Sequence, residues 1–386
     1  MFSKPKLIRT TTVALSLDYL LKGQLSFLNN HYEVVGVSGL DNHLDTVAKR
    51  EGIRTEAVAM KRAISPFNDV ISLWQLYRLF LKEKPQIVHS ITPKAGLLSM
   101  VAAYFAGVPI RIHTFTGLIF PSKTGMLQKI LILMDRLLCR FATHIYPEGE
   151  GVKEDLKRYS ITNKPLNVIA NGNVNGIDVA FFDPKLYGEV AIAMLKSKLK
   201  IKDDDFVFIF VGRLVGDKGI NELIAAFQKL QLVANNVKLL LVGPFENELD
   251  PLNLQTLAII DSSHHILSVG FQTDVRPYYA VADALVFPSY REGFPNVVLQ
   301  AGAMGLPSIV TNISGCNEII IEGKNGTIIP AKEMNAIYES MLKISTEVVF
   351  RNQLQLNARP LIVSRYQQQL VWQAILAEYK RVEKYV

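Results

Sequence analysis

The chain alternates short apolar runs with longer segments whose apolar residues recur at helical spacing. A run of this kind predicts a buried strand, and the intervening periodic segments predict helices. The predicted strands fall at residues 7–13, 32–38, 87–90, 108–114, 144–146, 166–170, 206–211, 237–242, 266–269, 284–287 and 308–311, with a further one near Val58. Such regular alternation indicates an α/β fold with parallel sheets.

One long predicted helix covers residues 66–84 and carries a recurring apolar set. Val70, Leu73, Leu76, Tyr77 and Phe80 fall on one face of this helix. We therefore expect that face to pack against the sheet.

A second predicted helix, at residues 123–143, allows two interpretations. It combines a dense apolar set with four cations, Lys123, Lys129, Arg136 and Arg140. A basic amphipathic helix can lie in a membrane interface. The preferred interpretation is a core helix that packs on the sheet. A core helix whose exposed end also touches lipid would satisfy both.

Composition places the chain among folded proteins with more than one domain. Its 386 residues are too many for one typical core, and 49% of them are hydrophobic against 20% charged. Two cysteines make no disulfide framework and fit a reducing compartment. No apolar run approaches the length of a membrane span, and the first residues lack a signal-peptide core. These features predict a cytoplasmic protein.

The net charge of +7 is distributed unevenly along the chain. Residues 1–190 hold 23 Lys and Arg against 16 Asp and Glu, whereas residues 191–386 hold 19 of each. The first half could therefore meet a membrane surface, a diphosphate or a nucleic acid, or the excess could be chance on a solvated surface. The lack of basic and aromatic clusters beyond the first domain counts against nucleic acid.

The stretch from residue 284 to 311 combines a strand, a turn, a helix and another strand. The turn carries Glu292 and Gly293, and Pro295 then precedes a helix that starts near Asn296. This unit is half of a doubly wound nucleotide-binding domain, whose ligands bind at the carboxyl ends of the strands. Glu292 and the helix N-terminus are thus candidate ligand contacts.

A second motif, GRLVGDKG, follows the apolar strand at 206–211. Its cations, Arg213 and Lys218, would suit a diphosphate, because arginine offers a planar bidentate group and lysine a point charge. A solvated loop with two incidental cations is the alternative. The position between a buried strand and a helix at 220–230 favours a functional site.

The first half offers weaker candidates. His113 ends a strand shortly before Gly117, and structural and catalytic interpretations carry equal weight there. His89 also ends a strand without further support. Gly23 is the one glycine in the loop after the first strand, and a plain turn is the preferred interpretation. The other histidines are interpreted as structural: His31, His43, His144, His264 and His265.

Three segments together resemble the family 4 retaining glycosyltransferases, which have the GT-B fold. EGFPNVVLQAGAMGLP is similar to the family signature EGFG-x-x-x-x-E-A-x-A-x-G-x-P, with Glu292 at its first glutamate and Gln300 in place of its second. GRLVGDKG is similar to GR-x-x-x-x-KG. The loop at residues 171–178 resembles a segment of the branch that extends lipid-linked saccharides in capsular and surface polysaccharide synthesis.

The resemblance implies two Rossmann-like doubly wound domains that face each other across a cleft. An acceptor-binding domain would span residues 1–185 and a nucleotide-sugar domain residues 186–364, with a helix at 365–386 crossing back to the first. Arg213 and Lys218 would stabilise the departing diphosphate, and Glu292 would bind donor sugar hydroxyls. His113 would lie near the transfer site. Further nucleotide-sugar contacts are implied at Gly23, Gly270, Phe271, Phe294, Pro295, Asn296 and Gln300.

The expected activity is sugar transfer with retention from a UDP-sugar to a saccharide. The acceptor would be linked to polyprenyl diphosphate at the inner membrane face, or soluble. Neither a metal nor another cofactor is expected, because the family resemblance does not require one. Gln300 has one acceptor oxygen and two donor hydrogens, so it would bind ribose without charge assistance. Two alternatives are a nucleotide-sugar epimerase of the same fold and a non-catalytic nucleotide-sugar-binding protein.

Overall fold

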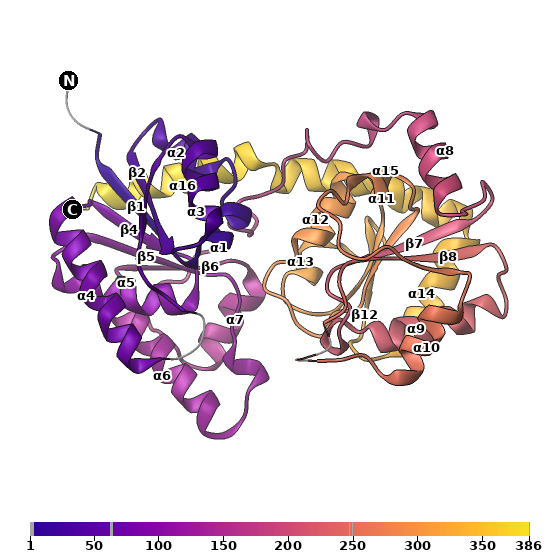
Figure 1. Ribbon diagram of the computed structural model, residues 1–386, viewed down its shortest axis with the longest axis horizontal. Coiled ribbons are helices and arrows are strands. Elements are labelled where there is room, and N and C mark those ends of the chain that lie inside the picture. Colours follow the sequence, from indigo (N-terminus) through magenta and orange to yellow (C-terminus); the bar gives the residue numbers. More distant parts are fainter. Residues whose placement is uncertain (1–3, 62–64, 247, 249, 386) are drawn as a thin grey trace. The chain divides into compact units, whose positions relative to one another are not determined.

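The computed structural model describes residues 4–61, 65–246, 248 and 250–385, and the chain divides into two compact units (Figure 1). Unit 1 comprises the chain as far as Gly176 together with the segment that starts at Gln368. Unit 2 comprises Ile177–Gln367. The sequence predicts boundaries at 185 and 364, and the compact units divide after residues 176 and 367.

Unit 1 is built on a six-stranded parallel sheet with the order β3-β2-β1-β4-β5-β6. Its strands are β1 (Lys6–Val13), β2 (Glu33–Gly39), β3 (Arg54–Ala57), β4 (Ile87–Ser90), β5 (Ile110–Phe115) and β6 (His144–Pro147). Leu7 pairs with Ile87 across β1 and β4, where the strand order reverses. Ligands of doubly wound sheets bind beyond the strand ends at such a reversal.

Helices cover both faces of this sheet because successive strand residues point to opposite sides. Ile8 belongs to a core shared with α4, α5 and α6, and Leu7 to a core shared with α1, α2, α3 and α16. These two groups lie on opposite sides of the strands (Figure 1). The helices are α1 (Ala14–Leu20), α2 (Gln24–Asn29), α3 (Asn42–Glu51), α4 (Pro66–Glu83), α5 (Pro93–Phe105), α6 (Gly125–Phe141), α7 (Glu150–Arg158) and α16 (Gln368–Glu383).

Unit 2 repeats the architecture with a second parallel sheet, in the order β12-β11-β10-β7-β8-β9. Every residue of β7 and β8 is buried, as their continuous apolar runs require. The strands are β7 (Phe206–Val211), β8 (Val237–Val242), β9 (Ile266–Ser268), β10 (Ala284–Phe287), β11 (Ser308–Thr311) and β12 (Gly326–Ile329). The helices are α8 (Glu189–Lys198), α9 (Ile220–Gln231), α10 (Leu254–Ser262), α11 (Arg276–Ala280), α12 (Asn296–Ala303), α13 (Cys316–Ile319), α14 (Met334–Thr346) and α15 (Val348–Tyr366).

The predicted α/β class with two doubly wound parallel sheets is confirmed, and two local expectations are wrong. Residues 166–170 form no strand, because Leu166 makes only an isolated bridge to Ile145. The final helix does not start at Arg365. Instead α15 ends at Tyr366, and α16 starts two residues later.

The two long helices on one side of unit 1 expose more apolar surface than the sequence indicates. Val70, expected on the packed face of α4, is exposed, whereas Leu76 and Phe80 are buried. In α6 only Leu138 and Cys139 are fully buried. When apolar residues occur on more than one side of a helix, the sequence does not show which side faces the core. Only the packed structure distinguishes the two sides. None of the described helices is both long and apolar enough to cross a membrane.

Asp135 stands on the inward side of α6, one turn before Leu138 and Cys139. Burial raises the pKa of its carboxyl from 3.8 to about 7. Between these values the folded chain binds a proton that the unfolded chain has lost. Stability contributed by this group therefore falls as the pH rises from about 4 to about 7, and the whole cost is present above that.

We predict that Asp135→Asn stabilises the protein at about pH 8 by on the order of 3 kcal/mol, since each unit of pKa is worth ~1.4 kcal/mol. The gain should shrink towards zero below about pH 3, where Asp135 is largely protonated in both states. Urea unfolding across this pH range measures the effect. Asp261→Asn, on the exposed side of α10, is the control. A gain at Asp135 that does not change with pH would contradict the prediction.

Candidate functional site

Two loops meet at the carboxyl edge of the sheet in unit 2. One follows β7 and carries the 3₁₀ turn Gly216–Lys218, and the other follows β10. The strands β7 and β10 are neighbours in the sheet, so their following loops emerge side by side. The Tyr290 N–H donates to the Asp217 carbonyl over 2.9 Å, which joins the two loops directly.

The centre of this site is an ion pair between Lys218 and Glu292. The lysine Nζ contacts Oε1 of the glutamate, and both side chains are largely removed from solvent. Ser289 Oγ donates to the same carboxylate oxygen over 2.8 Å. The ammonium also lies 5.8 Å from the ring centre of Phe287, the last residue of β10. The structure therefore brings together the two charges that the sequence placed on separate motifs.

Glycines make the close approach of these loops possible. Gly219 has a φ of +70°, and a Cβ there would lie 2.2 Å from the Pro288 carbonyl oxygen. Gly315 has a φ of +74°, and its Cβ would lie 2.4 Å from the Gly293 carbonyl oxygen. Both positions exclude any side chain by backbone geometry and by space.

The other cations of the edge also have carboxylate partners. Arg213 pairs with Glu246, and half of its side chain remains exposed. Arg291 pairs with Asp217 over 3.1 Å. Sequence reasoning predicted Arg213 but missed Glu246 and Ser289, because an isolated acid or serine in a loop carries no recognisable spacing.

The helix that follows Glu292 starts at Asn296, and Pro295 occupies its N-cap position rather than its first turn. Gln300 lies in this helix, and its Oε1 accepts a hydrogen bond from the buried Tyr279 hydroxyl over 3.3 Å. Phe294 is buried against Tyr366. The aromatic ring thus anchors the turn, and the Gln300 oxygen is already partly engaged.

The remaining candidates of unit 2 follow β9. Gly270 is left-handed, with a φ of +68°, and its carbonyl accepts from the Gly243 N–H over 2.9 Å. The Phe271 ring beside it is exposed. An exposed ring next to a fixed backbone turn suits stacking on a planar ligand.

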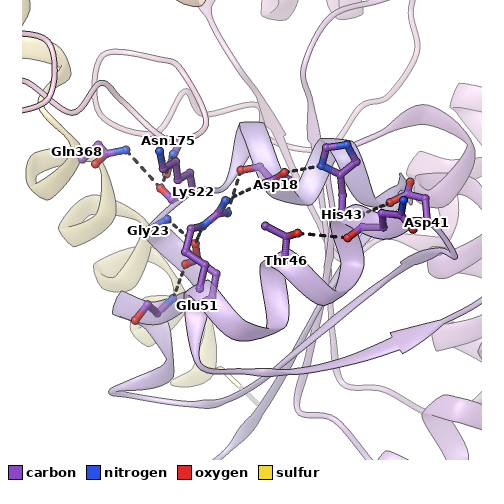
Figure 2. Close-up of polar contacts among 12 residues, drawn as sticks. Asp18, Lys22, Gly23, Asp41, His43, Thr46, Glu51, Asn175 and Gln368 are labelled. Carbon is purple, nitrogen blue, oxygen red and sulfur yellow. Dashed lines mark hydrogen bonds and ion pairs between the residues drawn. The ribbon is translucent and has the colours of Figure 1, made fainter. Parts of the chain in front are cut away.

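Gly23 in unit 1 is held by surrounding side chains (Figure 2). Its N–H donates to Glu51 over 2.9 Å, and a Cβ on it would lie 2.7 Å from the Trp372 ring. Asn175 Nδ2 donates to the preceding carbonyl, that of Lys22, over 3.0 Å. In the structure the Gly23 amide already has a protein acceptor, so its diphosphate contact stays a prediction.

His113 lies inside unit 1. Its Nδ1 is 2.8 Å from Ser90 Oγ, and its ring fills the space that a side chain on Gly96 would take. Burial lowers the pKa of His113 to about 3, so the ring is neutral at physiological pH. Contact between His113 and a substrate stays a prediction.

A buried polar cluster, which sequence reasoning missed, lies on the other face of the same sheet. Arg9 Nη1 donates to the Tyr379 hydroxyl over 2.9 Å, and His89 Nδ1 lies 2.6 Å from that hydroxyl. Both residues line a small cavity of about 20 Å³ together with Glu148. An arginine inside the apolar strand LIRTTTV was the signal available, because a buried cation needs nearby partners.

Among the described residues no group of three or more histidine, cysteine, aspartate or glutamate side chains could hold a metal ion.

The fold and the paired loops define the class of protein. Two doubly wound parallel sheets in one chain make up the GT-B fold of glycosyltransferases. The second sheet carries the GR-x-x-x-x-KG motif after β7, and Glu292 precedes the helix after β10. A glycosyltransferase from Rickettsia africae matches all of this chain and all of its own, with a TM-score of 0.83 and 17% identity. HepE from Anabaena, solved with UDP and glucose, covers 98% of this chain and all of its own, with a TM-score of 0.81 and 16% identity.

Sequence comparison identifies the family within this class. Residues 192–360 match the family described as Glycosyl transferases group 1, and residues 31–172 match the Glycosyl transferase 4-like domain. The capsular polysaccharide biosynthesis glycosyltransferase CapM of Staphylococcus aureus is 31% identical over 97% of this chain and 96% of its own. The chain therefore belongs to the family 4 glycosyltransferases.

A second relative covers most of the chain as well. It is an Escherichia coli enzyme named UDP-Gal:alpha-D-GlcNAc-diphosphoundecaprenol alpha-1,3-galactosyltransferase. Its identity is 31% over 79% of this chain and 78% of its own. The chain is thus a sugar-transferring enzyme, as the sequence predicts.

Gly315→Ala tests the backbone contact that closes the site. Gly323 is the matched control, because its φ of +71° is nearly the same while nothing lies within 4 Å of its Cβ position. We expect Gly323→Ala to cost about 1 kcal/mol of unfolding free energy from strain alone. Gly315→Ala should cost about 3 kcal/mol or more, because its Cβ meets backbone atoms that cannot move aside. Urea unfolding measures both, and equal losses would contradict the proposed contact.

Proposed function

We propose that this enzyme transfers a sugar, with retention, from a UDP-sugar to a saccharide carried on a polyprenyl diphosphate, in the synthesis of a surface polysaccharide. The observation that carries the proposal is the Lys218–Glu292 pair at the carboxyl edge of the second sheet. The UDP found with HepE and the diphosphoundecaprenol in the name of the E. coli relative support donor and acceptor respectively. Retention rests on the family resemblance.

In this proposal the two members of the pair contact different parts of the donor. Glu292 accepts hydrogen bonds from the sugar hydroxyls, and Ser289 holds its carboxylate in place. Lys218 and Arg213 neutralise the diphosphate as the bond from the sugar carbon to the phosphate oxygen breaks and the electron pair stays on UDP. The N–H groups at the start of α12 add a partial positive charge.

With these cations the proposed mechanism needs no metal ion. A departing diphosphate needs compensating positive charge, and arginine and lysine can supply it without a divalent ion. Glu292 and Glu246 keep the two cations in place before the donor arrives. Binding of the donor diphosphate would replace Glu246 as the partner of Arg213.

A polyprenyl-linked acceptor would be reached at the surface of a membrane. We propose that the enzyme works from the cytoplasm at the inner face of the membrane, with peripheral contact through residues 123–143. Several apolar residues of α6 in this segment are exposed. The basic excess of the first half supports contact with an anionic surface.

Glu292→Gln tests the donor site. The amide keeps the size of the side chain but removes its charge and half of its acceptor capacity. We expect the transfer rate to fall by about 100-fold or more, with the affinity for UDP within a few-fold of wild type. Radiolabelled sugar transfer and UDP calorimetry measure the two quantities. Glu339→Gln, on the exposed side of α14, is the control.

Full transfer by Glu292→Gln would remove the proposed role of the carboxylate. Sugar rearrangement of the donor without any acceptor would instead identify an epimerase.

Gln300→Ala tests the nucleotide contact. A neutral hydrogen bond to ribose is worth about 0.5–1.5 kcal/mol, so UDP should bind about two- to twelve-fold more weakly. Gln228→Ala, on the exposed side of α9, should leave UDP affinity unchanged. Equal affinities for wild type and Gln300→Ala would exclude Gln300 from the nucleotide site.

A further inference from the structure

The outward side of α4 carries an apolar stripe that one cation, Arg78, interrupts. Phe67 is 84% exposed and Trp74 is 56% exposed, although both are large and apolar. The stripe follows helical spacing, so its members share one side of the helix. Its residues are Phe67, Val70, Ile71, Trp74 and Leu81. In a helix that only covers a sheet, this side would be polar.

The outward side of α6 carries a second stripe of the same kind. Met126 is 77% exposed and Leu133 is 66% exposed. The inward side of the helix holds Leu138 and Cys139, so the stripe faces away from the core. Its residues are Met126, Leu127, Ile130, Leu133 and Leu137.

The end of α5, the helix that packs against both α4 and α6, adds two exposed aromatic rings. The helices α4, α5 and α6 share one core and lie side by side on the same side of the sheet (Figure 1). Tyr104 and Phe105 are exposed at the end of α5, and the Tyr104 ring lies 5.1 Å from that of Phe141 in α6. We call the two stripes together with Tyr104 and Phe105 the apolar face. Contiguous apolar patches of this kind are rare on monomers and mark interaction sites.

The segment that carries the apolar face, residues 66–141, is strongly basic. Residues 66–141 contain nine Lys and Arg against three Asp and Glu, so they carry +6 of the net charge of +7. Two of the three acids are neutralised within the fold. Asp69 pairs with Lys94 over 2.7 Å, and Glu83 pairs with Lys6. Cations therefore outnumber acids in the segment that carries the apolar face.

We propose that the apolar face inserts into the interfacial layer of an anionic membrane, with α4 and α6 lying in the membrane plane. This goes beyond contact through residues 123–143, because it adds α4 and the end of α5 and fixes which side of unit 1 meets the lipid. It also stands without any assignment of donor or acceptor.

Two features favour lipid over a protein partner. Aromatic residues with a polar end, such as Trp74 and Tyr104, are typical of the membrane interface. The Arg78 guanidinium lies 4.8 Å from the centre of the Trp74 ring, so its charge stands beside the apolar stripe where phosphate headgroups would lie. Basic residues near such a surface add attraction to anionic lipid.

Vesicle co-sedimentation of the full chain tests the proposal without substrates. The probes are vesicles of phosphatidylcholine alone and of equimolar phosphatidylcholine and phosphatidylglycerol. We expect wild type to bind the anionic vesicles and to dissociate at high salt. A variant with Phe67→Ser, Trp74→Ser, Met126→Ser and Leu133→Ser should bind roughly tenfold or more weakly. All four positions are exposed, so the variant should fold, and circular dichroism checks this.

The matched control replaces four equally exposed apolar residues of unit 2. Its changes are Leu232→Ser, Leu254→Ser, Val349→Ser and Leu356→Ser. This variant should bind anionic vesicles as wild type does. Loss of binding in both variants would show an unspecific loss of hydrophobicity and would overturn the assignment to the apolar face.

Tryptophan fluorescence gives an independent readout, because the chain has two tryptophans and Trp372 is buried. Anionic vesicles should shift the emission of Trp74 to shorter wavelength, and brominated lipid should quench it. Trp74→Phe should remove both effects. Two results would overturn the proposal: vesicle binding without any change at Trp74, or lipid-free self-association that the four changes on the apolar face abolish. The latter would make the apolar face a protein interface.

Discussion

Backbone-to-backbone contact at the carboxyl edge of the second sheet sets the geometry of the proposed donor site. Gly219 lies against the Pro288 carbonyl and Gly315 against the Gly293 carbonyl, at distances that leave no room for a side chain. The first contact joins the loop after β7 to the loop after β10, and the second joins the loop after β11 to the loop after β10. Lys218 on the loop after β7 thereby reaches Glu292 on the loop after β10. The two opposite charges form an ion pair that is partly shielded from solvent.

Unit 1 meets a different constraint, a buried cation that donates hydrogen bonds to neutral side chains. Arg9 depends on the Gln24 oxygen and the Tyr379 hydroxyl, and burial lowers the pKa of its guanidinium. The hydroxyl comes from α16, at the far end of the chain. Trp372 of the same helix donates to Asn175, which in turn holds the Lys22 carbonyl beside Gly23. The helix therefore supplies both packing and polar partners to unit 1.

The sequence predicts the strands of this protein better than its helices and loops. Buried parallel strands are short apolar runs, and both sheets contain the runs expected, apart from 166–170. The short strand β12 was missed because it begins at the glycine of an Asn-Gly pair, which is typical of a turn. Val70 shows the limit for helices, because periodicity finds a helix but does not select between two apolar sides.

In the candidate site, too, the sequence predicts some residues and misses others. Arg213, Lys218 and Glu292 could be found because their motifs have fixed spacing after a strand. Their partners could not, because Glu246 and Ser289 meet them only through the folded loops. Gly23 and His113 illustrate the converse. Their positions in sequence suggest a ligand, whereas Glu51 and Ser90 are the contacts that the folded chain gives them.

The placement of α16 also has a consequence for the order in which the protein is made. The strand β1 of unit 1 is synthesised before the whole of unit 2, whereas α16 of unit 1 is synthesised after it. Unit 2 has all of its residues before that helix exists. The nascent chain thus carries a complete second unit while Arg9 still awaits the hydroxyl of Tyr379. The first unit can therefore be completed only after every residue of the second unit has been made, even though its sheet is synthesised earlier.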